Sequence, residues 1–392
     1  MNKHYIQTDD YKIIIDEPAR DVPDFREYAQ QLSKIIVGSK PQFTVGIFGG
    51  WGTGKTTMMQ MINDEIQKRN SDIATTIWFD SWRYEREKYS LMIPLLRTII
   101  LSLHEVINST SIGNEKKATL IRVQMGFVKM IKAVAMGTGV NLGAEAGTSG
   151  GKVSAGLTLD FAKILNEFSS EGQVHVNQEK IYFHKHVSDY LRKELEGIKD
   201  KHRLVIFIDD LDRCTPEGAL EILESIKTFF DIEGIIYVIG MDPSTIDSII
   251  QVKYDKNPKI SGLDYMQKIV QLPCPIPVWS GEDLRRTITE IVNETRLPKD
   301  ITDKMLKQEI KDLIINSAKS NPRNIKRFVN SLVLSYSTSG KNIQDIYNEN
   351  LRNYIIENYL KGMIAIQTFY FRGEKWLRFL KMINNYHERI DS

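Results

Sequence analysis

The feature that most restricts how this chain can fold is a glycine-rich run, GGWGTGKT, at residues 49–56. It matches the pattern GxxxxGK(S/T), in which glycines permit a tight turn that points backbone N–H groups at phosphate oxygens. In such a loop Lys55 reaches the β- and γ-phosphates of a nucleoside triphosphate, and the Thr56 hydroxyl binds Mg²⁺. The residues predicted to bind the nucleotide are Gly49, Gly50, Trp51, Gly52, Thr53, Gly54, Lys55, Thr56 and Thr57.

The segments on either side of this run support a P-loop over a glycine-rich turn that binds nothing. Residues 43–48 are mostly apolar and predict a buried strand. Apolar side chains then recur at helical spacing between Met58 and Ile66. The order of strand, loop and helix places the partial positive charge of a helix N-terminus at the phosphate site.

A second part of the site is predicted far along the chain. The apolar run Leu204–Ile208 predicts a strand that ends in Asp209 and Asp210. A carboxylate at the end of such a strand is the magnesium-side partner of a P-loop. We expect Asp209 beside the metal ion, as Thr56 is, and Asp210 in position to polarise an attacking water. Alone, Asp209 and Asp210 would also fit an acidic turn that caps the strand. The presence of a P-loop in the same chain favours their roles in metal binding and water activation.

Composition limits the remaining possibilities. The 392 residues exceed a typical single domain, and a net charge of +2 gives no general case for nucleic-acid binding. The two cysteines, Cys214 and Cys274, predict a reducing compartment and no zinc site. Because neither a signal segment nor an apolar run long enough to span a bilayer is evident, we expect a cytoplasmic protein.

Strand and helix patterns alternate along most of the chain, which predicts an α/β fold with a parallel sheet flanked by helices. Ligands of such sheets bind at the carboxyl ends of the strands. We expect an N-terminal part of the core at 1–108, an insertion at 109–180, the rest of the core at 181–278 and a helical lobe at 279–392. The predicted helices cover 25–36, 90–107, 183–195, 219–230 and 325–336, and the strands after the P-loop cover 75–79, 204–208, 235–239 and a segment closing at 271–273.

The stretch 109–170 interrupts the alternation. It contains a basic amphipathic pattern with Lys116, Lys117, Arg122, Lys129 and Lys132, followed by a tract with eight glycines between 126 and 156. Three interpretations remain open. The stretch is a solvated mobile insertion, a surface that orders on a protein partner or second subunit, or, through residues 116–136, a contact with an anionic membrane surface.

Several motifs together resemble the KAP family of P-loop NTPases. They are GIFGGWGTGKTT (46–57), WFDSWRYERE (78–87), VIFIDDLDRC (205–214), VIGMD (238–242), YMQKIVQLP (265–273) and NPRNIKRFVN (321–330). The resemblance covers most of the chain and implies an additional-strand (ASCE-type) fold, ATP and Mg²⁺ as ligands, hydrolysis and self-assembly into a homo-oligomer.

In one respect the chain departs from many members of this family, and in another it fits the family but differs from related ATPases. Many members carry transmembrane helices between the P-loop and the acidic strand, where this chain has its 109–170 insertion without a clear span. The second acidic residue is Asp210 where related ATPases commonly have glutamate. Bacterial members are associated with exclusion of phage and mobile elements, which suggests a role in defence.

Hydrolysis also needs positive charge near the γ-phosphate, often from a neighbouring subunit. Arg213, Arg323 and Lys268 are the candidates. Arg323 opens the last predicted helix, as a sensor does in related ATPases, and it would otherwise be a solvated charge. Arg213 follows the acidic strand, and its competing role is an ion pair with Asp212 or Glu217. Trp51 is expected to pack or to stack near the loop, whereas Trp82 and Arg83 are expected near a phosphate or the sheet edge.

Three functions fit these residues. The first is an ATPase whose nucleotide state drives a conformational or oligomerisation switch. The second is a nucleotide-binding scaffold with little turnover. The third, a small-molecule or nucleic-acid kinase, is disfavoured because no arginine-rich lid follows the P-loop.

Overall fold

The computed structural model describes residues 12–15, 17–18, 22–39, 43–85, 91–109, 113–138, 202–228, 234–254, 262–339, 358, 360–362 and 364. These residues fall into two compact units. The sheet unit comprises Glu27–Gly50 and Lys55–Ile276, and the helical unit comprises Met1–Arg26, Trp51–Gly54 and Pro277–Ser392.

A parallel sheet forms the centre of the sheet unit. Its strands are β1 (Phe43–Phe48), β2 (Ala74–Asp80), β3 (Arg203–Asp209), β4 (Ile235–Met241) and β5 (Leu272–Pro275), in the order β2-β3-β4-β1-β5. All neighbouring strands pair in parallel. Val238 of β4 lies beside Val45 of β1 on one side and beside Phe207 of β3 on the other. Strand β4 thus separates the P-loop strand from the acidic strand. This confirms the additional-strand fold that the motifs predicted.

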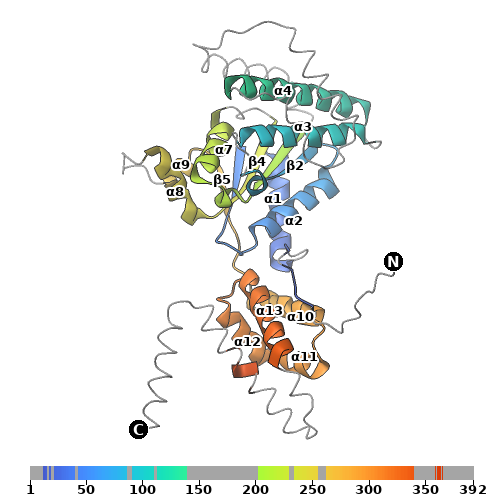
Figure 1. Ribbon diagram of the computed structural model, residues 1–392. Helices are drawn as coiled ribbons and strands as arrows, with labels where there is room; N and C mark the ends of the chain where they lie inside the picture. Colours follow the sequence, from blue (N-terminus) through green and yellow to red (C-terminus); the bar gives the residue numbers. More distant parts are fainter. Residues whose placement is uncertain are drawn as a thin grey trace, which may run out of the picture. The chain divides into compact units, whose positions relative to one another are not determined.

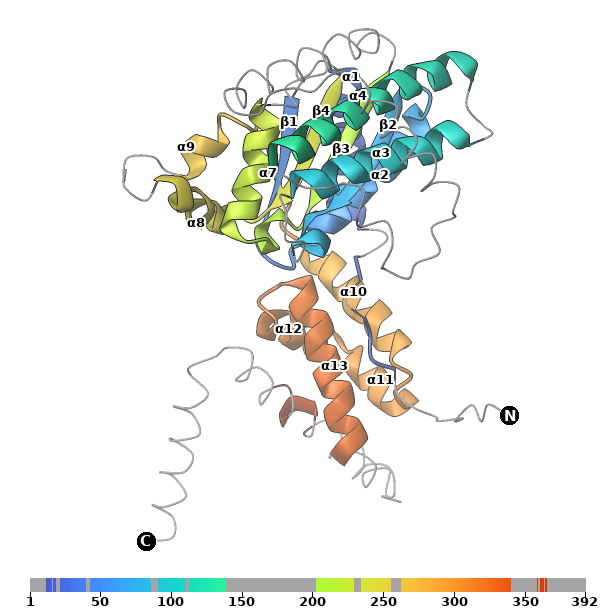
Figure 2. The same ribbon diagram turned by 45° about the horizontal axis from the view of Figure 1, so that its top comes forward.

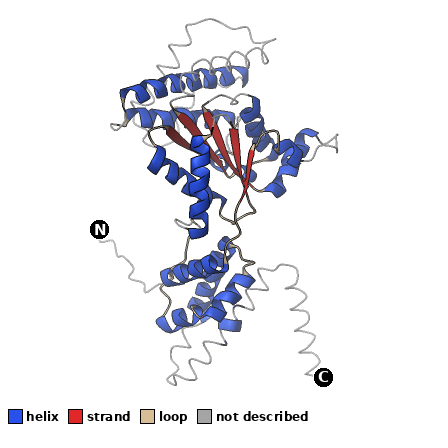
Figure 3. Cartoon of the chain, turned by 180° about the vertical axis from the view of Figure 1, so that it is seen from behind, coloured by secondary structure: helices blue, strands red, loops and turns tan. Residues whose placement is uncertain are grey.

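Helices cover both faces of this sheet (Figures 1 and 3). They are α1 (Pro23–Gly38), most of which belongs to this unit, α2 (Lys55–Asn70), α3 (Met92–Asn108), α4 (Asn114–Thr138), α7 (Pro216–Thr228), α8 (Pro243–Tyr254) and α9 (Gly262–Met266), with short 3₁₀ turns η1 (Ser81–Tyr84) and η3 (Leu211–Arg213). The inner strands are almost fully buried because helices enclose both faces. Their continuous apolar sequences reflect that burial.

The basic amphipathic pattern in the 109–170 stretch forms the helix α4. Its apolar side chains Leu120, Val123 and Phe127 are buried and join the same core cluster as α3. Lys116 lies at its start and bonds to the carbonyl oxygen of Ser71. The glycine-rich tract after residue 138 and the helix predicted at 183–195 lie outside the described residues.

The last strand differs from its prediction. We expected a strand to close at residues 271–273, whereas β5 begins at Leu272 and continues to Pro275. The apolar residues before it, from Tyr265 to Val270, belong to α9 and the turn that follows, where they are buried against neighbouring helices. A short apolar run suits a buried helix as well as a strand, and this caused the error.

The helical unit contains α10 (Gly281–Glu294), α11 (Lys299–Met305), α12 (Gln308–Ser317) and α13 (Pro322–Ser339), shown in orange in Figure 2. Ser280 caps α10 by accepting a hydrogen bond from the Asp283 backbone N–H. The segment around Ile14 runs along α13, because its N–H and carbonyl both bond to the Asn330 amide. No described helix combines the length and apolar character needed to cross a bilayer.

A buried histidine joins the start of β3 to β2. His202 is 3% exposed, and its Nε2 lies 2.7 Å from the Thr75 hydroxyl. Burial, reinforced by the charge of Lys116, lowers the pKa of His202 from 6.5 to about 4. The neutral ring is therefore the form that the folded protein holds, and protonation opposes folding.

This histidine predicts acid sensitivity. The unfolded chain binds more protons than the folded chain between pH 6.5 and about 4. The contribution of His202 to the free energy of unfolding is complete above pH 6.5. Below that pH, this contribution falls by up to about 1.4 kcal/mol per pH unit. In urea unfolding at several pH values, His202→Gln should flatten this decline, and His104→Gln in α3 should keep the wild-type decline. An unchanged decline in His202→Gln would contradict the assignment.

Candidate nucleotide-binding site

The carboxyl ends of β1, β4 and β3 meet at one edge of the sheet, as the strand order requires. Gly49 follows β1, and its N–H bonds to the carbonyl oxygen of Met241 at the end of β4. Asp209 is the last residue of β3, and α2 begins at Lys55. The predicted phosphate-binding lysine and the predicted metal-side carboxylate therefore belong to the same edge.

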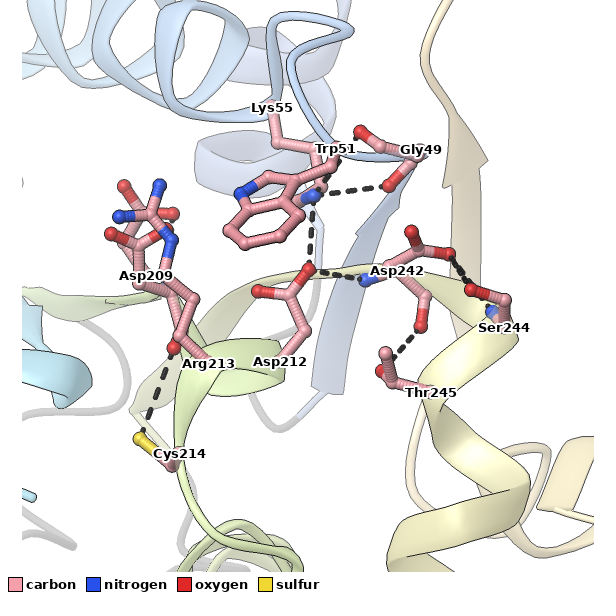
Figure 4. A network of polar contacts seen from close by, with 12 residues as sticks. Gly49, Trp51, Lys55, Asp209, Asp212, Arg213, Cys214, Asp242, Ser244 and Thr245 are labelled. Atoms are coloured by element: carbon pink, nitrogen blue, oxygen red, sulfur yellow. Dashed lines mark hydrogen bonds and ion pairs between the residues drawn. The ribbon is translucent and has the colours of Figure 1, made fainter. Parts of the chain in front are cut away.

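Lys55 is held by a dense set of contacts (Figure 4). Its Nζ donates to the carbonyl oxygens of Gly49 and Gly50, at 3.0 and 3.4 Å. It also forms an ion pair with Asp212 Oδ2 at 3.1 Å, and the two side chains are 7% and 6% exposed. The charge that would face a phosphate is thus buried and neutralised within the sheet unit.

Asp209 contacts the residue predicted to share a metal ion with it. The Thr56 hydroxyl and the Asp210 backbone N–H both hydrogen-bond to its carboxylate. Asp209 is 4% exposed, and burial raises its pKa although both hydrogen bonds oppose that change. The structure therefore brings Thr56 and Asp209 together.

The oxygen atoms at this edge suit Mg²⁺. Asp80, at the end of β2, is paired in register with Asp209, and its Oδ1 is buried with no hydrogen-bond partner among the described residues. Nowhere in the described part of the chain do three His, Cys, Asp or Glu side chains form a group that could hold a metal by themselves. Mg²⁺ usually takes one or two carboxylates and completes its shell with water and phosphate oxygens. The Thr56 hydroxyl and Asp209 carboxylate fit that pattern.

Asp210 stands in an unusual backbone conformation beside a positive charge. Its φ is +56°, in the left-handed region, and it caps the turn η3. Arg213 Nε lies 2.9 Å from Asp210 Oδ1. Burial and the neighbouring Asp209 raise the pKa of Asp210 to about 7, although Arg213 opposes this. The structure pairs Arg213 with Asp210, a carboxylate that was not among the competing partners, Asp212 and Glu217, suggested by the sequence.

Two aromatic and basic residues that the sequence singled out lie near this pair. The Trp82 ring, half exposed in η1, lies 5.3 Å from the Arg213 guanidinium carbon. This cation–π contact gives the Arg213 guanidinium a second partner besides the Asp210 carboxylate. Arg83 is exposed and stands 3.7 Å from Asp80. Trp82 therefore positions an arginine rather than packing in the core.

The central loop residues Trp51–Gly54 belong to the helical unit, which holds their carbonyl groups. The Asn321 amide donates to the Trp51 carbonyl oxygen at 2.8 Å, and Trp279 Nε1 donates to the Thr53 carbonyl oxygen at 2.7 Å. The Trp51 side chain itself is 66% exposed, so it is not buried in a core. Two carbonyl groups of the loop are thus fixed by donors of the helical unit. A loop whose carbonyl groups are held in this way is suited to presenting its N–H groups to a phosphate.

Arg323 and Lys268 have different surroundings. Arg323 lies in the first turn of α13, where its Cβ would touch a methyl group added to Gly52. It is therefore next to the loop within the helical unit. Lys268 is exposed in the turn before β5, at the amino end of a strand parallel to β1. That end is opposite the loop, so Lys268 does not reach the loop of its own chain.

Four residues at the site were missed as functional by sequence reasoning. Asp212 was considered only as a partner of Arg213, and Asp80, Trp279 and Asn321 were assigned no role. Asp80, Asp212 and Asn321 do lie within the quoted motifs WFDSWRYERE, VIFIDDLDRC and NPRNIKRFVN, which was the available signal. Their partners depend on contacts between distant segments, and no spacing rule gives these.

The parallel sheet with β4 between β1 and β3, the P-loop after β1 and the acidic end of β3 define an additional-strand P-loop NTPase. Residues 25–339 match the family model described as the KAP family P-loop domain. The chain belongs to this family.

Individual relatives are distant. The chain is 20% identical over 347 residues to the phage T7 exclusion protein of Escherichia coli K12, covering 82% of this chain and 43% of that protein. It thus spans less than half the length of that relative. An uncharacterized protein of Methanocaldococcus jannaschii is 32% identical over 167 residues, which is 40% of this chain and 84% of the relative. Among solved structures, the Aeropyrum pernix ORC1 protein in complex with DNA has a TM-score of 0.42 at 12% identity, with 91% of this chain and 71% of that chain covered.

Gly52 should be intolerant of any side chain. Its φ is +78°, and an added Cβ would lie 2.7 Å from both Arg323 Cβ and Asn321 Oδ1. Gly52→Ala should therefore lower stability by at least about 1–2 kcal/mol from backbone strain alone. Thermal unfolding measures this. Gly38→Ala is the control, because a Cβ there meets nothing within 4 Å. Equal melting temperatures for the two variants would refute the loop geometry.

Proposed function

We propose that the protein is a Mg²⁺-dependent ATPase whose nucleotide state drives a conformational or oligomerisation switch. The observation that carries this proposal is the hydrogen bond between the Thr56 hydroxyl and Asp209, which joins the P-loop helix to the acidic strand. That pairing of a P-loop hydroxyl with a strand-end carboxylate is the arrangement that holds Mg²⁺ in P-loop NTPases. The family membership of the chain supports the same conclusion.

The residues divide the chemistry among them. The loop N–H groups and Lys55 bind the phosphates, and Thr56 and Asp209 would hold Mg²⁺. When bound, the ion neutralises charge that develops on the phosphate oxygens. Asp210 orients the attacking water and accepts its proton. Arg213 supplies positive charge after leaving Asp210, or Arg323 supplies it from the start of α13.

One observation favours the alternative, a nucleotide-binding scaffold with little turnover. Asp210 and Arg213 are paired with one another at 2.9 Å, so the proposed base and a proposed charge donor occupy each other. A protein that kept this pair would bind nucleotide and hydrolyse it slowly. Comparing steady-state phosphate release with the thermal shift caused by nucleotide separates the two functions.

The name of one relative suggests a biological setting. The match to the phage T7 exclusion protein covers most of this chain. We therefore propose a role in defence against phage that depends on nucleotide. Self-assembly is proposed on the same family grounds, since the charge that completes many P-loop sites comes from a neighbouring subunit. Phage plating on cells that express the wild type or a Lys55 variant tests the first proposal, and sedimentation with and without nucleotide tests the second.

Lys55→Ala should abolish tight nucleotide binding, because it removes the buried positive charge at the loop. Calorimetric titration with ATP and Mg²⁺ at fixed salt measures the affinity. Lys68→Ala, at the other end of α2, is the matched control and should bind as the wild type does. Equal affinity in the two variants would end the P-loop interpretation.

Asp210→Asn should retain nucleotide binding and lose turnover by about 10²- to 10⁴-fold, the usual contribution of a positioned acid or base. Glu217→Gln, an exposed change in the first turn of α7, should retain activity. The measurement is phosphate release at saturating ATP. Hydrolysis by Asp210→Asn at the wild-type rate would show that the base has been assigned to the wrong residue.

A further inference from the structure

Asp212 makes the contact that most directly opposes phosphate binding. It is the direct ion-pair partner of Lys55, and both side chains are almost fully buried. Lys55 Nζ must turn toward phosphate oxygens if the loop binds a nucleotide. A contact that satisfies the lysine in the free protein therefore competes with the ligand.

The second oxygen of Asp212 strengthens this argument. Its Oδ1 is buried and has no hydrogen-bond partner among the described residues. If Lys55 leaves, the carboxylate keeps only the bond that its Oδ2 accepts from the Asp242 backbone N–H, at 3.0 Å. A buried carboxylate that loses its cation and gains phosphate charges nearby is strongly disfavoured.

The same bond connects the lysine to another element. Asp242 follows β4, and its carboxylate accepts hydrogen bonds from the backbone N–H and hydroxyl of Ser244 in the first turn of α8. Figure 4 shows this chain of contacts from Lys55 through Asp212 to the start of α8. Lys55 is thus connected through Asp212 to the junction of β4 and α8.

We propose that Asp212 is a positioning residue that holds Lys55 in the nucleotide-free site and must release it when phosphates bind. Asp212 thereby lowers nucleotide affinity and ties the loop lysine to the junction of β4 and α8. This inference rests on the proposed nucleotide site. It gives the third aspartate of the DDLDRC motif a role distinct from metal binding and from water activation.

The test compares nucleotide affinity in variants that remove the charge of Asp212. In Asp212→Asn, the amide oxygen can still accept from the Asp242 N–H, but the negative charge is absent. ADP and ATP should bind about tenfold more tightly, equivalent to about 1.4 kcal/mol. Calorimetric titration at fixed salt and Mg²⁺ gives the dissociation constants. Glu217→Gln is the matched control: it removes an exposed charge in the first turn of α7 that does not contact Lys55, and its affinity should equal that of the wild type.

Unchanged or weaker binding by Asp212→Asn would overturn the proposal, as would an equal gain in Glu217→Gln. Asp212→Ser provides a second neutral variant if the amide fails to fold, and the same gain is expected. A residue with only a structural role would lower stability without raising affinity.

A measurement without nucleotide keeps the inference separate from the proposed function. Lys55→Met and Asp212→Asn each leave one buried charge alone, whereas the double variant removes both. In urea unfolding, the double variant should lose less stability than the two single losses added together. Additive losses would overturn the ion pair itself. If the losses are coupled but the wild type binds no nucleotide, the proposed function fails while the pairing stands.

Discussion

Burial of positive charge at the carboxyl edge of the sheet is the constraint on which the site depends. A phosphate-binding lysine cannot be buried alone, because an unpaired charge in a weakly polar environment costs several kcal/mol. Asp212 compensates Lys55, and Asp210 compensates Arg213. Both of these cations are therefore paired with a carboxylate from the same short turn after β3. The pairing offsets the cost of burying these charges, and in the proposed nucleotide site the phosphates would replace Asp212 as the partner of Lys55.

The shape of the loop depends on a second constraint, the direction of its carbonyl groups. A loop that points N–H groups inward must place its carbonyl groups elsewhere, and these need donors. In the helical unit, Asn321 and Trp279 supply donors for two of them. Asn321 also accepts from the N–H groups of Arg323 and Asn324, so one side chain both caps α13 and holds the loop. The position of α13 and the conformation of the loop are thus set by the same amide.

Much of this fold was predictable because its signals are local. The strand at 43–48 matched its prediction, since an apolar run followed by glycines has few other readings. The additional strand between the P-loop strand and the acidic strand was implied by the family that the motifs resemble. The failures involve distant contacts or ambiguous runs. The pairing of Lys55 with Asp212 joins segments more than a hundred residues apart in sequence, and the apolar run before β5 has no period that separates strand from helix.

The helix α4, the described part of the insertion after α3, is bound to the core more closely than its composition suggested. Interfacial helices place their apolar face in the lipid. In α4 the side chains of Leu120, Val123 and Phe127 instead pack into the core beside α3, which is itself tied to α7 through the bond from the Leu91 N–H to Glu221. Contact of α4 with an anionic membrane would have to rely on exposed basic residues such as Arg122, and electrostatic attraction of this kind weakens as salt increases. A protein partner with an acidic surface would contact these basic residues and would need no exposed apolar face on α4. The packing of α4 therefore favours such a partner over lipid.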